Sequence, residues 1–349
     1  MFYRNSGPWI MGLITAISLG EVLMFPAPAQ VTKPVNTITR PRSQTPRDQA
    51  LPSQAIIRLA NTKLPYPITQ GQGNLPLQAL SGGLSWTMTV KTGAHSGQFL
   101  LDTGASISIV TAAWTKLLGL TGTPIPRENT RYAVAGNACR EMDTALYTLP
   151  PLILDRAEVK GLQALQLSQG MVPEGVMGIL GMDVLSRFHF RLNPARRELQ
   201  LMPPQPLPDS DRAIPLVMRE GVALVKVRLN NSQPFLFLID TGAESLFISP
   251  KVAAQLHLAP EAMQAVDVQG FCGLEPARYT TLKTVSLGDG TGKLGEASLT
   301  QVETVVLQNT AVLDSLQVDG ILGQNFLQAF QQEWYFNNDQ TEGRLLLNR

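Results

Sequence analysis

The residues Phe99-Leu-Leu-Asp-Thr-Gly-Ala105 are the most informative stretch of this sequence, because they return almost unchanged as Phe237-Leu-Ile-Asp-Thr-Gly-Ala243. In both copies an aspartate follows three apolar residues, which is typical of the end of a buried strand. The glycine two positions further on lets the backbone turn tightly and lets another segment approach closely. A motif that occurs twice in one chain predicts two related structural units.

A second motif is repeated downstream of each aspartate. Gly178-Ile-Leu-Gly181 follows the first aspartate, and Gly320-Ile-Leu-Gly323 follows the second at nearly the same interval. Because the order and the spacing of the motifs agree, we expect both copies to fold in the same way.

The segments around these motifs have the patterns of β-strands. Residues 85–92 and 223–229 alternate between apolar and polar side chains, as half-buried strands do. Each copy closes with two apolar segments around an Asn-containing turn, which predicts a hairpin. The predicted fold class is all-β, mainly strands with a few short helices, in two lobes related by a pseudo-twofold axis with a cleft between them. Trp114 and Val252 are expected on the core faces of short helices after the aspartate loops.

The chain of 349 residues divides into five predicted segments. Residues 1–29 form a signal peptide and residues 30–79 a Pro-rich tether or pro-segment. Residues 80–203 form the N-terminal lobe, 204–213 a Pro-rich linker, and 214–349 the C-terminal lobe. An unstructured tether is favoured over an inhibitory pro-segment, because no helix-forming basic stretch stands out in residues 30–79.

Composition excludes several classes of partner. The net charge is +1 and charged residues make up 16% of the chain, so neither a nucleic-acid-binding face nor an acidic tail is expected. The hydrophobic fraction of 44%, with 29 Gly and 25 Pro, is typical of a globular β-rich chain with many turns.

The N-terminus has the features of a secretory signal. Arg4 precedes an apolar run that ends near Gly20, and Ala27-Pro-Ala29 is a small-x-small cleavage site. We therefore predict an extracytoplasmic protein, periplasmic or secreted, without stable membrane insertion after cleavage. An uncleaved N-terminal anchor is the alternative.

The two aspartates suggest a specific chemistry. Burial at a strand end raises the pKa of a carboxyl group, and a twofold arrangement would bring Asp102 and Asp240 within hydrogen-bond reach. Two carboxylates that close share one proton. Such a pair activates water against an amide without a covalent intermediate, a metal or a cofactor. His95, His189 and His257 have neither metal-ligand spacing nor a nucleophile with an obvious partner, so zinc and Ser-His hydrolysis are not expected. No cofactor is expected either.

At these residues the sequence resembles the retropepsin-like aspartic proteases of the pepsin and retropepsin superfamily, over roughly residues 80–347. The resemblance implies that Asp102 and Asp240 are the catalytic pair. The residues that it implies as supports of the catalytic loops are Thr103, Gly104, Gly181, Thr241, Gly242 and Gly323. Because both aspartates lie in one chain, we expect a monomer that acts on a peptide or protein substrate.

Pepsin-type enzymes usually carry Ser or Thr after Asp-Thr-Gly, whereas this chain has Ala105 and Ala243. Loss of a hydroxyl donor to the ionised carboxylate raises the pKa of the pair. We therefore expect activity at mildly acidic pH.

The resemblance also implies a lid on each lobe. The candidate hairpins are residues 132–139, with Ala135 and Gly136 near the tip, and residues 266–273, with Gln269 and Gly270 near the tip. These four residues are the predicted substrate-binding positions of the lids.

The only two cysteines, Cys139 and Cys272, follow these tips at near-equivalent positions. In an oxidising compartment they can form a disulfide that links the two lids. Two unpaired thiols packed as small apolar groups are the alternative. Glu244, which stands where the first copy has Ser106, is expected to face solvent and not to perturb Asp240.

The predicted activity is that of an aspartic-type endopeptidase, which hydrolyses peptide bonds with water activated between two carboxylates. The alternative is a protease-like peptide-binding module whose site is silent or closed by a disulfide.

Overall fold

The computed structural model describes residues 55–59, 64–80, 83–134, 139, 142–168, 172–288 and 297–349. The predicted signal peptide and residues 30–54 of the predicted tether lie outside these ranges. No helix among the described residues is long and apolar enough to cross a membrane.

The N-terminal lobe is built mainly from short strands. The elements are β1 (Ala55–Leu59), β2 (Ile68–Gln70), β3 (Gly73–Ala79), β4 (Trp86–Thr92), β5 (His95–Leu101), β6 (Ile109–Val110), α1 (Ala112–Leu117), β7 (Thr123–Ile125), η2 (Arg127–Asn129), β8 (Thr130–Val134), β9 (Thr144–Thr148), β10 (Leu152–Leu154), β11 (Ala157–Lys160), β12 (Gln163–Leu167), β13 (Val176–Leu180), α2 (Met182–Leu185), β14 (His189–Asn193) and β15 (Glu198–Met202).

The C-terminal lobe repeats this arrangement with longer strands. The elements are β16 (Ile214–Arg219), β17 (Val222–Leu229), β18 (Phe235–Ile239), β19 (Leu246–Ile248), α3 (Pro250–Gln255), η3 (Pro260–Ala262), β20 (Gln264–Gly270), β21 (Gly273–Leu287), β22 (Ala297–Leu307), α4 (Ala311–Leu316), β23 (Gly320–Leu322), α5 (Gln324–Leu327), β24 (Gln331–Phe336) and β25 (Glu342–Asn348).

Strand pairing around the aspartates is the same in both lobes. The aspartate-bearing strand pairs antiparallel with the strand before it, β5 with β4 and β18 with β17. It also pairs parallel with the strand of the Gly-Ile-Leu-Gly motif, β5 with β13 and β18 with β23. The next short strand pairs antiparallel with the motif strand, β6 with β13 and β19 with β23. The predicted all-β fold with two related lobes is confirmed.

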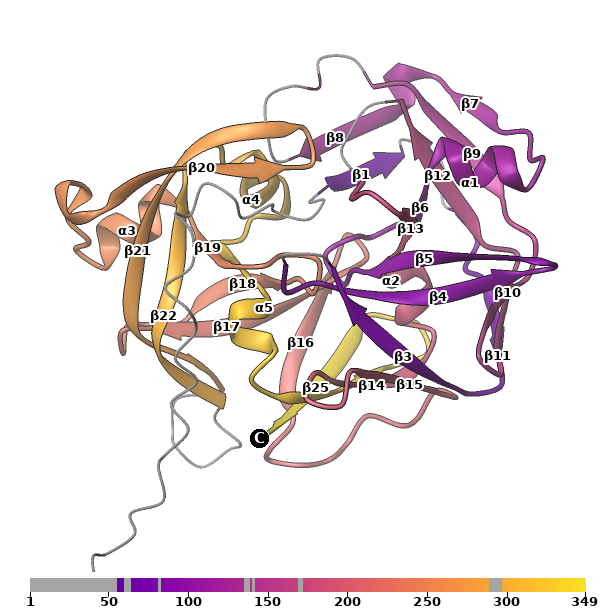
Figure 1. Ribbon diagram of the computed structural model, residues 1–349. Helices are drawn as coiled ribbons and strands as arrows, with labels where there is room; N and C mark the ends of the chain where they lie inside the picture. The colour runs from indigo at the N-terminus through magenta and orange to yellow at the C-terminus, as the bar shows by residue number, and fades with distance from the viewer. Residues whose placement is uncertain are drawn as a thin grey trace, which may run out of the picture. The chain divides into compact units, whose positions relative to one another are not determined.

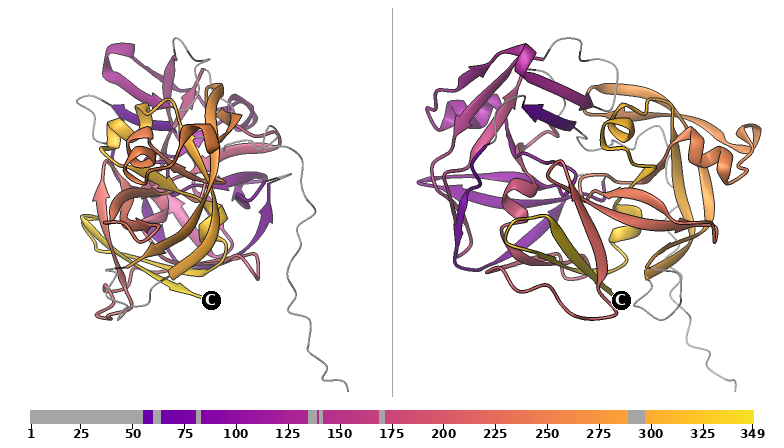
Figure 2. Two further views of the ribbon diagram at one scale, coloured as in Figure 1. Left: turned by 90° about the vertical axis from the view of Figure 1, so that its left-hand side faces the viewer. Right: turned by 180° about the vertical axis from the view of Figure 1, so that it is seen from behind.

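The two lobes are joined by a sheet to which both contribute strands. Strands β14 and β24 pair antiparallel between the lobes, and each is flanked by its own hairpin partner, β15 and β25. Strands β3 and β16 continue the sheet beyond these partners. Figures 1 and 2 show this sheet below the aspartate-bearing strands. Phe190 of β14 stacks on Trp334 of β24 with ring centroids 5.4 Å apart, so the junction is packed as well as hydrogen-bonded.

Part of the predicted tether is folded, which corrects the sequence prediction. Strands β2 and β3 lie within residues 30–79, and β1 pairs antiparallel with β8. In β3 the residues Leu75 and Leu77 are buried and their neighbours are exposed. Proline interrupts this alternation in the sequence, but β3 pairs with β15 up to Pro76 and with β4 only from Leu77, so Pro76 lies where the strand changes partner. The folded lobe therefore begins before residue 80.

The helices after the aspartate loops form as predicted. Helix α1 begins after Thr111, whose hydroxyl accepts a hydrogen bond from the N–H of Trp114. Helix α3 begins after Ser249, whose hydroxyl accepts the N–H of Val252. These side chains cap the free N–H groups of the first turn. Trp114 and Val252 are both buried, as expected for core faces.

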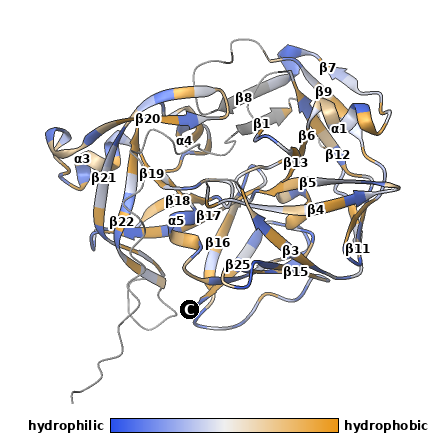
Figure 3. Ribbon diagram, in the orientation of Figure 1, coloured by the Kyte–Doolittle hydropathy of each residue, from blue (hydrophilic) through white to orange (hydrophobic). Residues whose placement is uncertain are grey.

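Successive side chains of the aspartate-bearing strands and of the motif strands point to opposite sides, into two different apolar cores. Leu101 and Leu180 join a large core that extends into both lobes, whereas their neighbours Leu100 and Ile179 point to the other side. Figure 3 shows hydrophobic residues along β13 and β18, where these strands cross the interior.

Two further clusters lie on that other side. The N-lobe cluster comprises Leu100, Ala105, Ile109, Met142, Leu165, Val176 and Ile179, together with Phe271 and Cys272. The C-lobe cluster comprises Val222, Leu224, Leu238, Ala243, Phe247, Val266, Val268, Ala277, Val305, Leu307, Val312, Leu313, Leu316, Val318 and Ile321.

Candidate active site

The two aspartates lie at equivalent strand ends and are almost completely buried. Asp102 follows β5 and Asp240 follows β18, and each is only 1% exposed. Parallel pairing to β13 and β23 fixes their position, because the N–H of Asp102 donates to the carbonyl of Leu180 and that of Asp240 to the carbonyl of Leu322. Strands with both faces buried thus deliver two acids into the interior.

The threonines after the aspartates connect the two loops reciprocally. The Thr103 hydroxyl donates to the carbonyl of Ile239 (2.9 Å) and accepts the N–H of Thr241 (3.0 Å). The Thr241 hydroxyl donates to the carbonyl of Leu101 (2.9 Å) and accepts the N–H of Thr103 (3.0 Å). Both threonines are fully buried, so these four bonds form away from water and hold the loops in one relative position.

The glycines allow the carboxyl groups to approach the opposite loop. A methyl group at Gly242 would lie 2.6 Å from Cγ of Asp102, and one at Gly104 would lie closer still to Cγ of Asp240. Each carboxyl group therefore packs against the glycine of the other motif. Only a residue without a side chain fits at these two positions.

Backbone N–H groups orient the carboxylates. The N–H of Gly104 donates to Oδ1 of Asp102 at 2.8 Å, and that of Gly242 donates to Oδ1 of Asp240 at 2.8 Å. Oδ1 of Asp240 also accepts the N–H of Ala243 at 3.0 Å. These bonds favour the ionised form and fix the plane of each carboxyl group.

The electrostatics of the pair are those of two acids that share one proton. Burial raises the pKa of Asp102 well above its ordinary value, and the charge of Asp240 and the hydrogen bond between the two side chains raise it further. Burial also raises the pKa of Asp240, although the hydrogen bonds from Asp102, Gly242 and Ala243 act in the opposite direction. Burial and mutual proximity thus favour a state in which the pair as a whole carries one proton.

The glycines that end the Gly-Ile-Leu-Gly motifs lie directly behind the aspartate loops. A methyl group at Gly181 would lie 2.7 Å from the carbonyl oxygen of Ala105, and one at Gly323 would lie 2.7 Å from that of Ala243. The residues after these glycines donate their N–H groups to the same two carbonyl oxygens, at 2.8 Å and 2.7 Å. The motif strands and the aspartate loops are thus in direct contact.

Glu244 does not face solvent, which corrects the sequence prediction. The side chain is 5% exposed, and its Oε1 accepts the N–H of Leu84 from the other lobe at 3.0 Å. Gly83 leaves the space that this carboxyl group occupies. Burial raises the pKa of Glu244 to about 7. A contact with a turn far away in the sequence gives no local signal, so sequence reasoning missed it.

Two other contacts near the loops were also not predicted. The Ser85 hydroxyl donates to the carbonyl of Gly242 at 3.1 Å, which adds a further hydrogen bond between the lobes. Asp183 accepts both the N–H and the hydroxyl of Ser108, and burial raises its pKa to about 6. The equivalent residue of the C-terminal lobe is Asn325, so the carboxylate is particular to one lobe.

The second predicted lid is a hairpin in the structure. Strands β20 and β21 pair along their length up to Gly270 and Gly273, so the turn itself consists of Phe271 and Cys272. Gly270 is thus the last residue of the strand and not the tip. The Gln269 side chain donates to the carbonyl of Gly270 at 2.9 Å. The first predicted lid, with Ala135 and Gly136, lies outside the described residues, apart from Cys139 and the backbone of β8.

The two cysteines are joined. The sulfur atoms of Cys139 and Cys272 lie 2.08 Å apart and the Cα atoms 5.2 Å apart. This disulfide links the lobes at the tip of the β20–β21 hairpin, next to the N-lobe cluster.

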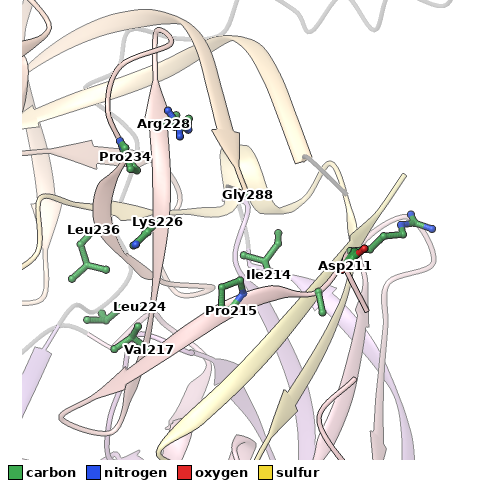
Figure 4. Close-up of a pocket in the computed structure, with 12 residues that line it drawn as sticks. Asp211, Ile214, Pro215, Val217, Leu224, Lys226, Arg228, Pro234, Leu236 and Gly288 are labelled. Carbon is green, nitrogen blue, oxygen red and sulfur yellow. The ribbon is translucent and has the colours of Figure 1, made fainter. Parts of the chain in front are cut away.

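A cavity of about 460 Å³ lies on the C-terminal lobe, lined by apolar residues such as Ile214 and Leu236 with Lys226 and Arg228 (Figure 4). It does not include either aspartate of the pair. In the part of the chain that the structure describes, His, Cys, Asp and Glu residues form no group of three or more that could hold a metal ion.

Comparison with known families agrees with this geometry. A family model described as "gag-polyprotein putative aspartyl protease" matches residues 88–187, which contain Asp102 and the first Gly-Ile-Leu-Gly motif. A model described as "Aspartyl protease" matches residues 225–326, which contain Asp240 and the second motif. No curated protein shows significant sequence similarity to this chain. The chain belongs to the retropepsin-like aspartic proteases and carries one family domain in each of its two lobes.

Proposed function

We propose that this protein is an aspartic endopeptidase that hydrolyses peptide bonds with a water molecule activated between Asp102 and Asp240. The observation that supports this most directly is the packing of each carboxyl group against the glycine of the opposite motif. That packing brings two acids together in a buried site, where like charges cannot both ionise.

The hydrogen bonds of the two acids support the roles that we assign to them. Asp240 accepts two backbone N–H groups, which favour its ionised form, and it takes a proton from the attacking water. Asp102 holds the shared proton and donates it to the carbonyl oxygen of the peptide bond. The oxygen of water bonds to the carbonyl carbon. The C–N bond of the tetrahedral intermediate then breaks, the amine takes the proton from Asp240, and a hydroxyl of the intermediate returns its proton to Asp102 as the C=O bond re-forms. Thr103 and Thr241 position the loops and do not touch the reacting atoms.

The test is digestion of a peptide library by the wild-type protein and by the variants Asp102→Asn and Asp240→Asn. We expect either substitution to lower kcat/KM by about 1,000-fold or more, because the pair can no longer act as both acid and base. Circular dichroism and thermal unfolding should show that both variants remain folded.

A matched control is Asp183→Asn, which makes the same chemical change at a buried aspartate outside the pair. The C-terminal lobe already carries Asn325 at the equivalent position, so this variant should keep most of its activity. Equal activity of wild type and both pair variants would refute the mechanism. Tight peptide binding without cleavage would favour the peptide-binding module.

We also propose that the protein acts as a monomer outside the cytoplasm. The disulfide between Cys139 and Cys272 supports this location, because such bonds persist mainly in oxidising compartments. The N-terminal sequence, with its apolar run and Ala27-Pro-Ala29, supports export.

A further inference from the structure

The internal repeat allows the two apolar clusters beside the aspartates to be compared position by position. Both contain the leucine two residues before the aspartate, the alanine three residues after it, and the isoleucine of the Gly-Ile-Leu-Gly motif. These residues are Leu100, Ala105 and Ile179 in the N-terminal lobe, and Leu238, Ala243 and Ile321 in the C-terminal lobe. Both clusters therefore border the aspartate pair.

The C-lobe cluster is covered by a helix of its own lobe. Val312, Leu313 and Leu316 of α4 are buried in it. Helix α4 lies in the connection between β22 and β23, residues 308–319. The apolar surface next to Asp240 is therefore covered by the lobe that bears it.

The N-lobe cluster is covered by the other lobe. The corresponding connection between β12 and β13 spans residues 168–175 and is shorter, and its described residues form no helix. Phe271 and Cys272, the tip of the β20–β21 hairpin, are buried here instead. Phe271 is 1% exposed, although Leu274 on the same hairpin is 60% exposed. Figures 1 and 2 both show the tip of this hairpin reaching the N-terminal lobe beside β8.

We infer that Phe271 occupies a substrate side-chain pocket of the N-terminal lobe, so that its side chain must leave the pocket before a peptide side chain can bind there. This inference rests on the proposed function. Two residues of this pocket, Leu100 and Ala105, lie within three positions of Asp102 in sequence, so the side chain that it accepts belongs to a residue near the scissile bond. A benzyl side chain already fits there, so the matching substrate residue is a large apolar one, with phenylalanine as the reference.

The disulfide holds the tip in this pocket. Cys272 is adjacent to Phe271, and its partner Cys139 packs against the same cluster. A dithiol reductant can release it by thiol–disulfide exchange. The reductant gives two electrons and two protons, becomes a cyclic disulfide, and leaves Cys139 and Cys272 as thiols. The oxidised chain is therefore latent and the reduced chain is active.

The latency can be measured as an increase in the apparent Kd for a peptide. If only a fraction of molecules has the tip withdrawn, the apparent Kd for a peptide increases by the inverse of that fraction. Phe271→Ala empties the pocket and keeps the disulfide. The double variant Cys139→Ser/Cys272→Ser keeps Phe271 and removes the covalent link. The two variants separate occupancy of the pocket from fixation of the tip.

The experiment measures kcat/KM for matched peptides with Phe or Ala beside the cleaved bond, without reductant. We expect Phe271→Ala to exceed oxidised wild type by about tenfold or more on the Phe peptide, and the double-serine variant to exceed it as well. Dithiothreitol should raise the activity of wild type and leave the double-serine variant unchanged. Leu274→Ala, at an exposed position of the same hairpin, is the control and should behave as wild type.

A second readout does not require turnover. A fluorescent statine-type peptide with a Phe side chain should bind Phe271→Ala more tightly than oxidised wild type, as measured by anisotropy. Equal Kd and equal kcat/KM for these two proteins would overturn the inference, as would lower activity of Phe271→Ala. If no protein cleaves any peptide, the proposed function fails, and the Kd comparison alone then decides whether Phe271 fills the pocket.

Discussion

The N-terminal and C-terminal lobes share the strand pairing around their aspartates and differ in what covers the apolar cluster beside each one. The C-lobe cluster is covered by helix α4, which follows β22 within the same lobe. The N-lobe cluster is covered by Phe271 and Cys272 from the opposite lobe. The two copies of the repeat thus have the same structure where the two aspartates meet, which is the strict part of the repeat. They differ where the substrate is proposed to enter, which is the relaxed part.

The strict part of the repeat can be tested at the two glycines. Gly104→Ala and Gly242→Ala each place a methyl group against the carboxyl group of the opposite aspartate. We expect either variant to lose at least about 100-fold in kcat/KM, because a small displacement of the pair destroys its geometry. The two losses should be similar, since the loops are equivalent.

A suitable control is Gly93→Ala in the turn between β4 and β5. No atom lies within 4 Å of the methyl group that it adds, and its positive φ predicts only a modest loss of stability. If Gly104→Ala retained full activity, the close approach of the two loops would be wrong.

The relaxed part of the repeat predicts unequal stability effects. Leu313→Ala in α4 removes a buried side chain from a permanent core, and we expect it to lower the free energy of unfolding by about 2–5 kcal/mol. Phe271→Ala should cost less, although phenylalanine is larger, because the pocket that it leaves opens toward the proposed binding cleft and water can enter.

Urea denaturation of both variants, with exposed Leu274→Ala as the reference, measures this difference. An equal or larger cost for Phe271→Ala would mean that the hairpin tip is a fixed part of the core.

The two positions after the Asp-Thr-Gly-Ala motifs, Ser106 and Glu244, predict a pH effect on one side only. Burial raises the pKa of Glu244 from 4.5 to about 7, so its protonated form is favoured in the folded protein. The contribution of protonated Glu244 to the free energy of unfolding is therefore fully present below about pH 4.5 and is lost as the pH rises through 7.

Glu244→Gln should keep an acceptor for the N–H of Leu84 and remove this pH dependence of the free energy of unfolding, worth about 3 kcal/mol between these limits. Thermal unfolding of wild type and variant at a series of pH values checks this. Parallel curves for the two proteins would contradict the assignment to Glu244.

The smallest effect is expected at the alanines of the motifs. Ala105→Ser and Ala243→Ser each add a hydroxyl donor close to a carboxylate, which favours the ionised form. We expect the acidic limb of the kcat/KM profile to move to lower pH by less than about one unit. The wild-type profile should have its optimum at mildly acidic pH. An optimum in strong acid, or a shift to higher pH in the serine variants, would refute this reasoning.

The sequence predicts those parts of the structure that the repeat encodes locally. The strands that end at Asp102 and Asp240, and the helices capped by Thr111 and Ser249, follow from apolar patterns and turn residues. The folded strand β3 was missed because Pro76 obscures the alternation of Leu75 and Leu77.

Contacts between the lobes could not be predicted in the same way. Glu244 is buried because Gly83 and Leu84 of the other lobe close over it, and Phe271 is buried among residues of the other lobe. Neither residue differs locally from one that faces solvent. Such burial depends on how the two lobes meet, which a pattern within one segment does not contain.

The sheet formed by β14 and β24 has a consequence for folding. Because backbone hydrogen bonds and the stacked rings of Phe190 and Trp334 run across the boundary, neither lobe can complete its edge alone. Denaturation should accordingly be all-or-none for the whole molecule. The Pro-rich linker then serves only to raise the effective concentration of one lobe at the other. A chain cleaved in this linker would stay assembled.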